Sequence, residues 1–411
     1  MTIRTSEPRE LLALIPFQLG FHPAESAVLI SLRGARSRVG LIARVDLADL
    51  GDEVSGPPLA RSLVGSLVAD GARRVVVVIY SAEDLQRAGG DDDRHGHRDG
   101  DGSADTAGPA GRAVRALEDA AGYHLEGIDC WVVGPTGYYS PQCVDPACCP
   151  PGGRPLSDLQ ATRVGAEMVL QGVGVAPSRD DLVVIPVAGA AQRRAARRAR
   201  DRWRARGAAA APGAAAHRWR REGLTTWRAT LEDALAGGLD PQEGCAAVTD
   251  LGAADPAMPL RLGARPTAPL PAAQLGRLLA ALDDVLVRDA VLLTFVAGND
   301  RVADRLVAGE SGADIGRALG AITDPTCGQR PDARRCGAAR AVLEAMVGHA
   351  PRAAHAPALT LLAVLAWWAG DGARAGILVD RALDADPGYR LALLVDQALR
   401  AGMPPGWARA G

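Results

Sequence analysis

Apolar residues in the first 135 positions form short runs of strand character separated by a segment of helical spacing. The runs predict four strands, at Ala27–Leu32, Val39–Leu47, Val75–Tyr80 and Ile128–Val133. A short connection between the first two strands predicts an antiparallel hairpin. The helical segment 111–121 between the last two predicts a parallel crossover. We therefore expect residues 1–187 to form an α/β domain, a mixed sheet with helices packed on it.

Three further segments of this half carry predictions. We expect a helix over Glu7–Leu14 that Pro16 ends, because proline lacks the backbone donor that continues a helix. The β-branched run Leu182–Val187 predicts another strand. Residues 81–108 form an acidic, glycine-rich insertion, which we expect to be disordered.

Beyond residue 187 the apolar pattern is helical, so we expect an all-α second half. Residues 188–223 predict an arginine-rich helix with an alanine-rich linker at 208–216, and residues 224–411 predict a helical domain with a loop or linker at 237–271. The last helices resemble one tetratricopeptide-type repeat, because small and apolar residues lie at its spacing. These residues are Leu362, Gly370, Ala375, Ala382 and Pro387. One repeat is too short for a solenoid, so we expect a compact bundle containing this hairpin.

Composition narrows the function classes. All 46 basic residues are arginine, and the absence of lysine excludes a Walker phosphate loop and Schiff-base chemistry. A net charge of −2 provides no overall attraction to nucleic acid or to an anionic membrane. The longest apolar run, Ala358–Ala369, is too short to span a bilayer. With no signal-peptide pattern and seven cysteines, an odd number, we expect a cytoplasmic protein with reduced thiols.

The segment Arg193–Arg221 contains eleven arginines, interleaved with Trp203 and Trp219 and followed by Trp227. Basic charge next to aromatic side chains is typical of proteins that bind single-stranded nucleic acid. An arginine-biased composition also produces such runs on solvated helix faces. We favour the solvated face, and nucleic-acid binding stays an alternative.

Three cysteines follow the last predicted strand of the first half. Cys143, Cys148 and Cys149 lie in a proline-rich loop, and Cys130 on the preceding strand is a candidate fourth ligand. Thiolates at this spacing can hold zinc. A single cluster without a second short-spaced pair is also typical of plain buried thiols, which we favour, and a redox role is the third alternative.

A second candidate site lies near the predicted strand ends. His22 and Glu25 occupy a turn before the first strand, and Arg44 and Asp46 lie two apart on the second strand. With Tyr139 nearby they would form a ligand pocket at the ends of the sheet strands. The simpler interpretation, a capping turn and a surface ion pair, is the one we favour. The chain lacks GxSxG, HExxH and a dinucleotide fingerprint, so whether it is an enzyme stays open.

Several stretches together resemble a bacterial family catalogued as domain of unknown function 4192. They are Leu14–Leu32, Gly40–Leu47, Cys143–Leu156, Val287–Leu292 and Leu365–Pro405. The resemblance implies an α/β front half and a helical back half, and it implies no activity. We therefore expect a non-catalytic protein that binds a ligand or a partner, either a small molecule or another protein. The alternatives are a metal- or thiol-dependent enzyme using the cysteine cluster, and a nucleic-acid binder.

Overall fold

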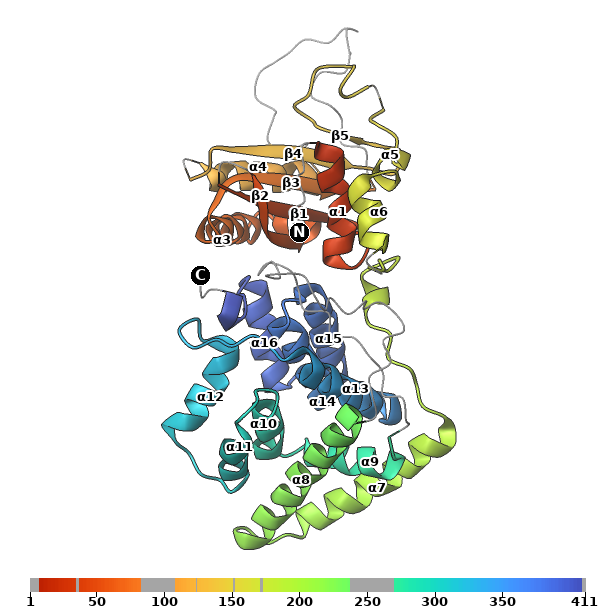
Figure 1. Cartoon of the computed structure of the whole chain (residues 1–411), viewed down its shortest axis with the longest axis vertical. Coiled ribbons are helices and arrows are strands. Elements are labelled where there is room, and N and C mark those ends of the chain that lie inside the picture. The colour runs from red at the N-terminus through yellow and green to blue at the C-terminus, as the bar shows by residue number, and fades with distance from the viewer. Residues whose placement is uncertain are drawn as a thin grey trace. The chain divides into compact units, whose positions relative to one another are not determined.

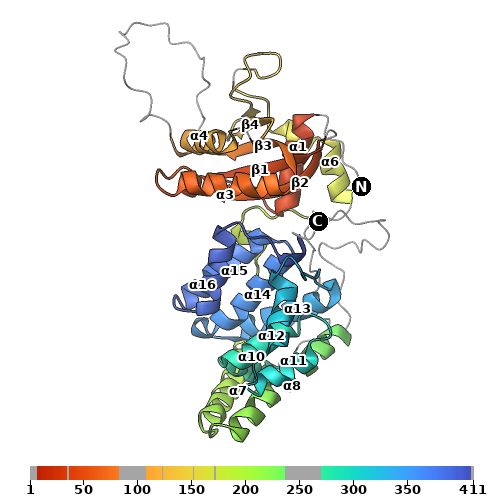
Figure 2. The same ribbon diagram turned by 90° about the vertical axis from the view of Figure 1, so that its left-hand side faces the viewer.

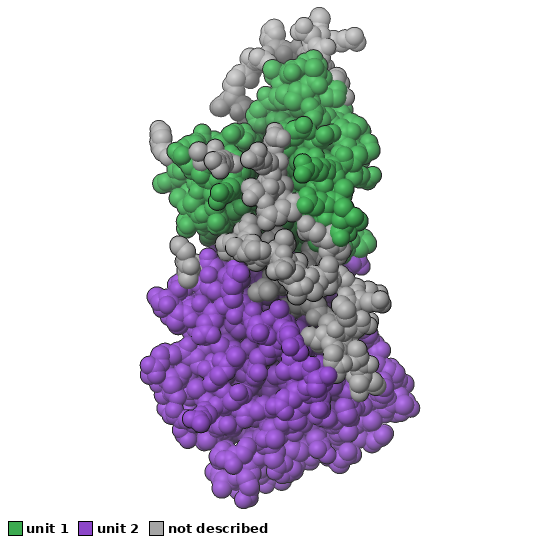
Figure 3. All heavy atoms as spheres, in the orientation of Figure 1, with its two compact units in different colours: residues 1–179 green, residues 180–411 purple. Residues whose placement is uncertain are grey.

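The computed structural model describes residues 7–34, 37–82, 108–122, 124–150, 152–170, 173–236 and 270–408. The chain divides into two compact units, residues 1–179 and residues 180–411 (Figure 3). The first unit is α/β and the second is helical, which confirms the order of the two predicted halves. Most of the predicted insertion and most of the predicted 237–271 linker lie outside the described residues.

A five-stranded mixed sheet forms the centre of the first unit (Figure 1). Its strands are β1 (Ser26–Arg33), β2 (Arg38–Asp46), β3 (Ala72–Tyr80), β4 (Gly127–Val133) and β5 (Tyr138–Tyr139), in the order β2-β1-β3-β4-β5. β1 and β2 pair antiparallel as a hairpin, and β3 and β4 pair parallel. Both pairings were predicted. Val75–Tyr80 is buried throughout, because helices cover both faces of β3.

The described helices of this unit pack on the sheet in two groups. They are α1 (Pro8–Leu19), α2 (Leu47–Leu50), α3 (Gly56–Ala69), α4 (Pro109–Ala121), α5 (Ser157–Gln160) and α6 (Arg163–Leu170). Helices α2, α3 and α4 contact one another, and α1 contacts α5 and α6. The prediction that Pro16 ends the first helix was wrong. Pro16 removes a single hydrogen bond within α1, and the helix ends at Gly20, whose φ of 81° is left-handed and whose N–H donates to Pro16 O.

Helices make up most of the described residues of the second unit. They are η1 (Asp180–Leu182), α7 (Ala190–Ala208), α8 (Ala214–Ala236), α9 (Ala272–Ala281), α10 (Val285–Leu293), α11 (Asp300–Val307), α12 (Ala313–Thr323), α13 (Ala333–His349), η2 (Arg352–Ala354), α14 (Ala356–Trp368), α15 (Gly372–Ala385), α16 (Arg390–Arg400) and η3 (Gly406–Ala408). Figure 2 shows α14, α15 and α16 side by side. Helices α14 and α15 form the predicted hairpin, turning at Gly370 with a φ of 87°. Its likeness to a tetratricopeptide repeat stays a proposal.

Two segments differ from the prediction. Residues 182–187 are not a strand, because no strand lies beside them among the described residues. The Val183 carbonyl instead accepts a hydrogen bond from the side chain of Arg381 on helix α15, at 2.7 Å. The alanine-rich stretch 208–216 is not an extended linker, since α7 ends in it, Gly213 turns the chain and α8 starts at Ala214. Alanine is the strongest helix former, so both helices extend into the stretch.

The tryptophans of α7 and α8 lie in the core of the helical unit. Trp203 and Trp219 are each 8% exposed and Trp227 is fully buried. The Trp219 indole donates to Trp203 O at 3.1 Å, and the Trp227 indole donates to the Thr294 hydroxyl at 2.9 Å. These indoles are therefore used in packing and do not offer faces for stacked bases. Among the described residues no helix combines the length and apolar character needed to cross a membrane.

Candidate metal centre

The cysteine loop runs from the end of β5 at Tyr139 to the start of α5 at Ser157. Its return is tied to the sheet, because Tyr138 and Arg154 exchange two backbone hydrogen bonds, both 2.9 Å long. Glycine is required at position 153, where φ is 82° and a β-carbon would lie 3.1 Å from Tyr138 O. The prolines of the loop prevent regular structure, so turns set the directions of its side chains.

One tight turn positions two of the thiols. Asp145 accepts the backbone N–H groups of Cys148 and Cys149 on its carbonyl oxygen, at 3.1 and 2.8 Å. Its carboxylate accepts the N–H of Ala147 at 2.9 Å. Cys143 precedes this turn, and its own N–H donates to Ser140 O at 3.1 Å. The turn therefore folds Cys148 and Cys149 back toward Cys143.

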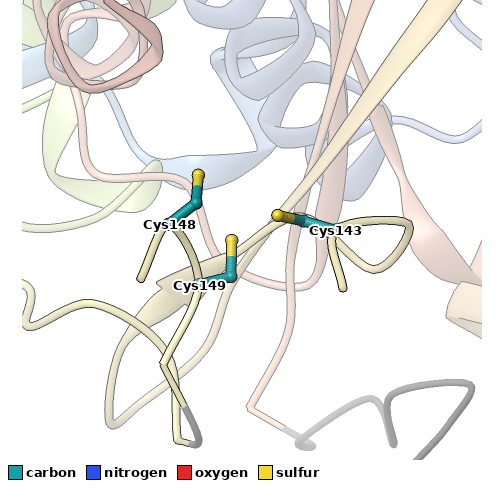
Figure 4. Close-up of side chains that lie close together, drawn as sticks. All are labelled: Cys143, Cys148 and Cys149. Carbon is teal, nitrogen blue, oxygen red and sulfur yellow. The ribbon is translucent and has the colours of Figure 1, made fainter. Parts of the chain in front are cut away.

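The three sulfur atoms converge. Figure 4 shows the side chains of Cys143, Cys148 and Cys149 close together, and all three Sγ atoms lie within 4.8 Å of one another. Zinc–sulfur bonds of about 2.3 Å place sulfurs about 3.8 Å apart around a tetrahedral ion. Side-chain adjustments of about 1 Å would thus bring the thiolates to bonding distance.

The three thiols differ in their electrostatic surroundings. A hydrogen bond with the Asp145 backbone lowers the pKa of Cys143, with smaller contributions from the two neighbouring thiols. Burial is the main cause that raises the pKa of Cys149, which is 1% exposed. The Arg154 guanidinium lies 3.6 Å from Cys148 Sγ and donates to Cys148 O at 2.5 Å. Arg154 thus places a positive charge beside the cluster.

Cys130, the fourth ligand suggested by the sequence, is not part of this group. It lies on β4 with 2% exposure. Burial, assisted by the charge of Glu118 on α4, raises the pKa of Cys130 to about 12. Among the described residues the group consists of the three loop cysteines, without a histidine, aspartate or glutamate. Arg154 was not selected as a site residue from the sequence. The one feature that could have pointed to it is its position, five residues after Cys149.

The residues of the second candidate site are divided between the two edges of the sheet. Arg44 pairs with Asp46 at 2.7 Å on β2, the edge strand. Tyr139 is buried on β5 at the opposite edge, so three strands, and about 19 Å at 4.8 Å per strand, separate it from β2. The Glu25 carboxylate accepts the N–H of Ala82 at 2.6 Å, which ties β1 to the end of β3.

His22 is exposed, and its backbone N–H donates to Ala176 O at 3.1 Å. Glu25, Arg44 and Asp46 gather near the ends of β1 and β2, where the Arg44 guanidinium also approaches Ala24 O at 3.5 Å. Their contacts hold strand ends together, which fits the capping turn and ion pair that the sequence favoured. The cysteine loop is the better candidate, because its side chains converge.

The family comparison agrees with the resemblance noted in the sequence. A family model described as domain of unknown function (DUF4192) matches residues 8–309 and 326–406. No curated protein and no solved structure matches the chain. Since the match covers nearly the whole chain, the chain belongs to the DUF4192 family.

Proposed function

We propose that this member of the DUF4192 family is a non-catalytic binding protein whose α/β unit holds a zinc ion on the thiolates of Cys143, Cys148 and Cys149. The observation that carries the proposal is the mutual distance of the three sulfurs, within 4.8 Å. The ion would join the two arms of the cysteine loop and fix its surface next to β5. That surface would then be presented to a protein or small-molecule partner.

Convergence favours a metal over plain buried thiols. Burial alone requires a thiol to be surrounded by apolar atoms and does not require it to face two others. Cys143 and Cys148 are in addition only half-buried, although their sulfurs lie within 4.8 Å of the sulfur of the buried Cys149. Soft thiolates select zinc among the common divalent ions, and three of them on Zn²⁺ leave one negative charge. Arg154, beside Cys148, would offset that charge.

Three thiolates leave one of the four zinc positions to a ligand from outside this set. A metal-dependent hydrolase fills that position with water, which the ion acidifies and a neighbouring base commonly helps to activate. The one carboxylate of the turn, Asp145, is engaged by the N–H of Ala147. This arrangement favours holding the loop over catalysis, and an enzyme that uses the same thiols is the runner-up.

The test is the metal content of the full chain purified without chelator. We expect about one zinc per chain, and Co²⁺ substitution should produce a thiolate-to-cobalt charge-transfer band. Cys148→Ser should abolish both. Cys327→Ser is the matched control, because Cys327 is exposed in the helical unit and outside the cluster, and this variant should keep both.

A structural role adds a second readout that does not need a variant. Removing the ion with chelator should lower the thermal midpoint of the α/β unit, and added zinc should restore it, because an ion bound to the folded state stabilises that state by mass action. Absence of zinc and of the cobalt band, with no effect of chelator, would leave the thiols as ordinary buried side chains. Zinc binding combined with hydrolysis that Cys143→Ser abolishes would instead establish the runner-up.

A further inference from the structure

Helix α7 is held on the helical unit by one side. Ala196, Ala199 and Trp203 are buried on that side. Helix α9 lies along it (Figure 1), and at Gly276 the two helices are so close that a β-carbon would come within 2.1 Å of Ala196 O. At 100° per residue, position 194 lies opposite the centre of this buried side, and positions 198 and 202 lie about 40° and about 80° further round the exposed surface. The packing therefore fixes the direction of that opposite side.

The opposite side is basic and unbalanced. Asp201 is the one acidic residue of α7, and it lies 3.9 Å from Arg197 with both side chains mostly exposed. The exposed arginines of α7 that form no ion pair with a described residue are Arg193, Arg194, Arg198 and Arg202. Like charges four residues apart repel, so this row opposes helix formation until an anion neutralises it.

The dimensions of the row suit a polyanion. Four residues of helix rise about 6 Å, so Arg194, Arg198 and Arg202 cover about 12 Å. A nucleic-acid duplex presents about one negative charge per 1.7 Å of its axis, so several phosphates lie within reach of the row. Arginine also binds phosphate oxygens in a bidentate manner, with its position already set by the rigid packing of α7.

We propose that this row, Arg194, Arg198 and Arg202, binds the phosphate backbone of duplex nucleic acid. Single strands are disfavoured because the tryptophans that would stack bases are buried. An acidic protein is disfavoured because protein interfaces are enriched in aromatic residues and depleted of alanine, whereas the exposed apolar residues that flank this row are alanines, Ala191 and Ala205. The proposal concerns the helical unit and does not depend on the zinc site.

The test compares two triple variants of the full chain. The first is Arg194→Gln with Arg198→Gln and Arg202→Gln. The control is Arg301→Gln with Arg317→Gln and Arg334→Gln, which removes the same charge from exposed positions on three other helices of the same unit. Affinity for a fluorescent DNA duplex, an RNA duplex and a single strand is measured by anisotropy between about 50 and about 200 mM salt. Circular dichroism verifies that both variants keep their helix content.

We expect the wild type and the control to bind duplexes with affinity that falls steeply with salt. In the α7 variant the slope of log K against log salt should shrink by about 0.9 for each phosphate that is no longer neutralised, up to about 2.7. Equal affinity for DNA and RNA duplexes would show that the row binds phosphates without regard to helix geometry. A preference for one of them would show whether the row fits the B-form or the A-form duplex.

Three results would overturn the proposal. The first is no duplex binding at the lowest salt, and the second is an equal decrease of affinity in both variants. The third is tighter binding of polyglutamate than of a duplex, which would assign the row to an acidic protein.

Discussion

Gly276→Ala should destabilise the helical unit, although alanine is the better helix former. Gly276 lies in α9 where it crosses Ala196 of α7, and an added β-carbon would meet Ala196 O at 2.1 Å, with the carbonyl carbon at 2.9 Å. Real β-carbons do not approach closer than 3.0 Å, so the helices must separate by about 1 Å. The obstructing atoms belong to backbone, so no side-chain rotation relieves the clash.

Two terms of opposite sign determine the magnitude. Alanine gains about 1 kcal/mol over glycine in a helix interior. Overpacking of a tight interface costs about 1–3 kcal/mol, and moving two helices apart also loosens the neighbouring Trp203. Because a whole helix must shift, we take the overpacking cost at the upper end, about 3 kcal/mol. Subtracting the gain of about 1 kcal/mol from alanine leaves a net decrease of about 2 kcal/mol in the free energy of unfolding.

Urea unfolding followed by tryptophan fluorescence measures this decrease selectively, because six of the seven tryptophans lie in residues 180–411. Gly316→Ala is the control. Gly316 lies inside α12 with no atom within 4 Å of the added β-carbon, so this variant should gain about 0.5–1 kcal/mol. If Gly276→Ala is as stable as the wild type, or if both variants gain, α7 and α9 do not cross closely at this glycine.

Two further outcomes follow from side-chain interactions. Asp70→Asn should destabilise the α/β unit by about 2–4 kcal/mol in thermal or urea unfolding, because the carboxylate accepts from Ser31, Arg33 and the Leu41 N–H, and an amide would turn a donor toward Arg33. The control Asp129→Asn removes an ion pair whose side chains are nearly half exposed, so it should cost less than about 1 kcal/mol. Equal losses of stability in the two variants would show that the Asp70 hydrogen bonds are not what stabilises the unit. In the native protein at neutral pH, Cys336 should resist iodoacetamide, whereas the exposed Cys327 should react. Burial raises the pKa of the Cys336 thiol to about 12, so the reactive thiolate forms only as the pH rises toward that value. Rapid labelling of Cys336 in the native protein would show that α13 opens.

The strands of the sheet could be predicted from the sequence, because a continuous apolar run indicates a buried segment. Val75–Tyr80 is apolar at every position, and only a strand covered on both faces buries such a run. The run 182–187 has the same β-branched character but no strand beside it among the described residues, and its Val183 carbonyl accepts from the Arg381 side chain of a helix instead. Strand propensity is thus realised only where a partner strand exists, and partners are a property of the whole fold.

The helix ends were less predictable, because they depend on tertiary packing. The alanine-rich stretch 208–216 has no apolar periodicity and so suggested a linker. Its ends join the two helices, α7 up to Ala208 and α8 from Ala214, and residues 209–213 turn between them. Trp203 and Trp219 hold the two helices together, with their indole centroids 6.0 Å apart. Pro16 is tolerated within α1 for a related reason. The packing of that helix on the sheet outweighs one missing hydrogen bond.

Residue type favoured plain buried thiols and a solvated arginine face, and the arrangement of the side chains is what argues for the alternatives. Spacing shows only that Cys143, Cys148 and Cys149 can meet. Their burial as independent apolar side chains would place each sulfur against carbon, whereas the turn at Asp145 folds Cys148 and Cys149 back toward Cys143, so that all three sulfurs lie within 4.8 Å of one another. In the arginine segment, the tryptophan side chains point into the core. Their burial removes the surface on which bases would stack, so positive charge is what the exposed side of α7 offers a ligand. A site defined by charge alone must be salt-dependent and indifferent to base identity, whereas a site defined by converging thiolates must be selective for soft metals.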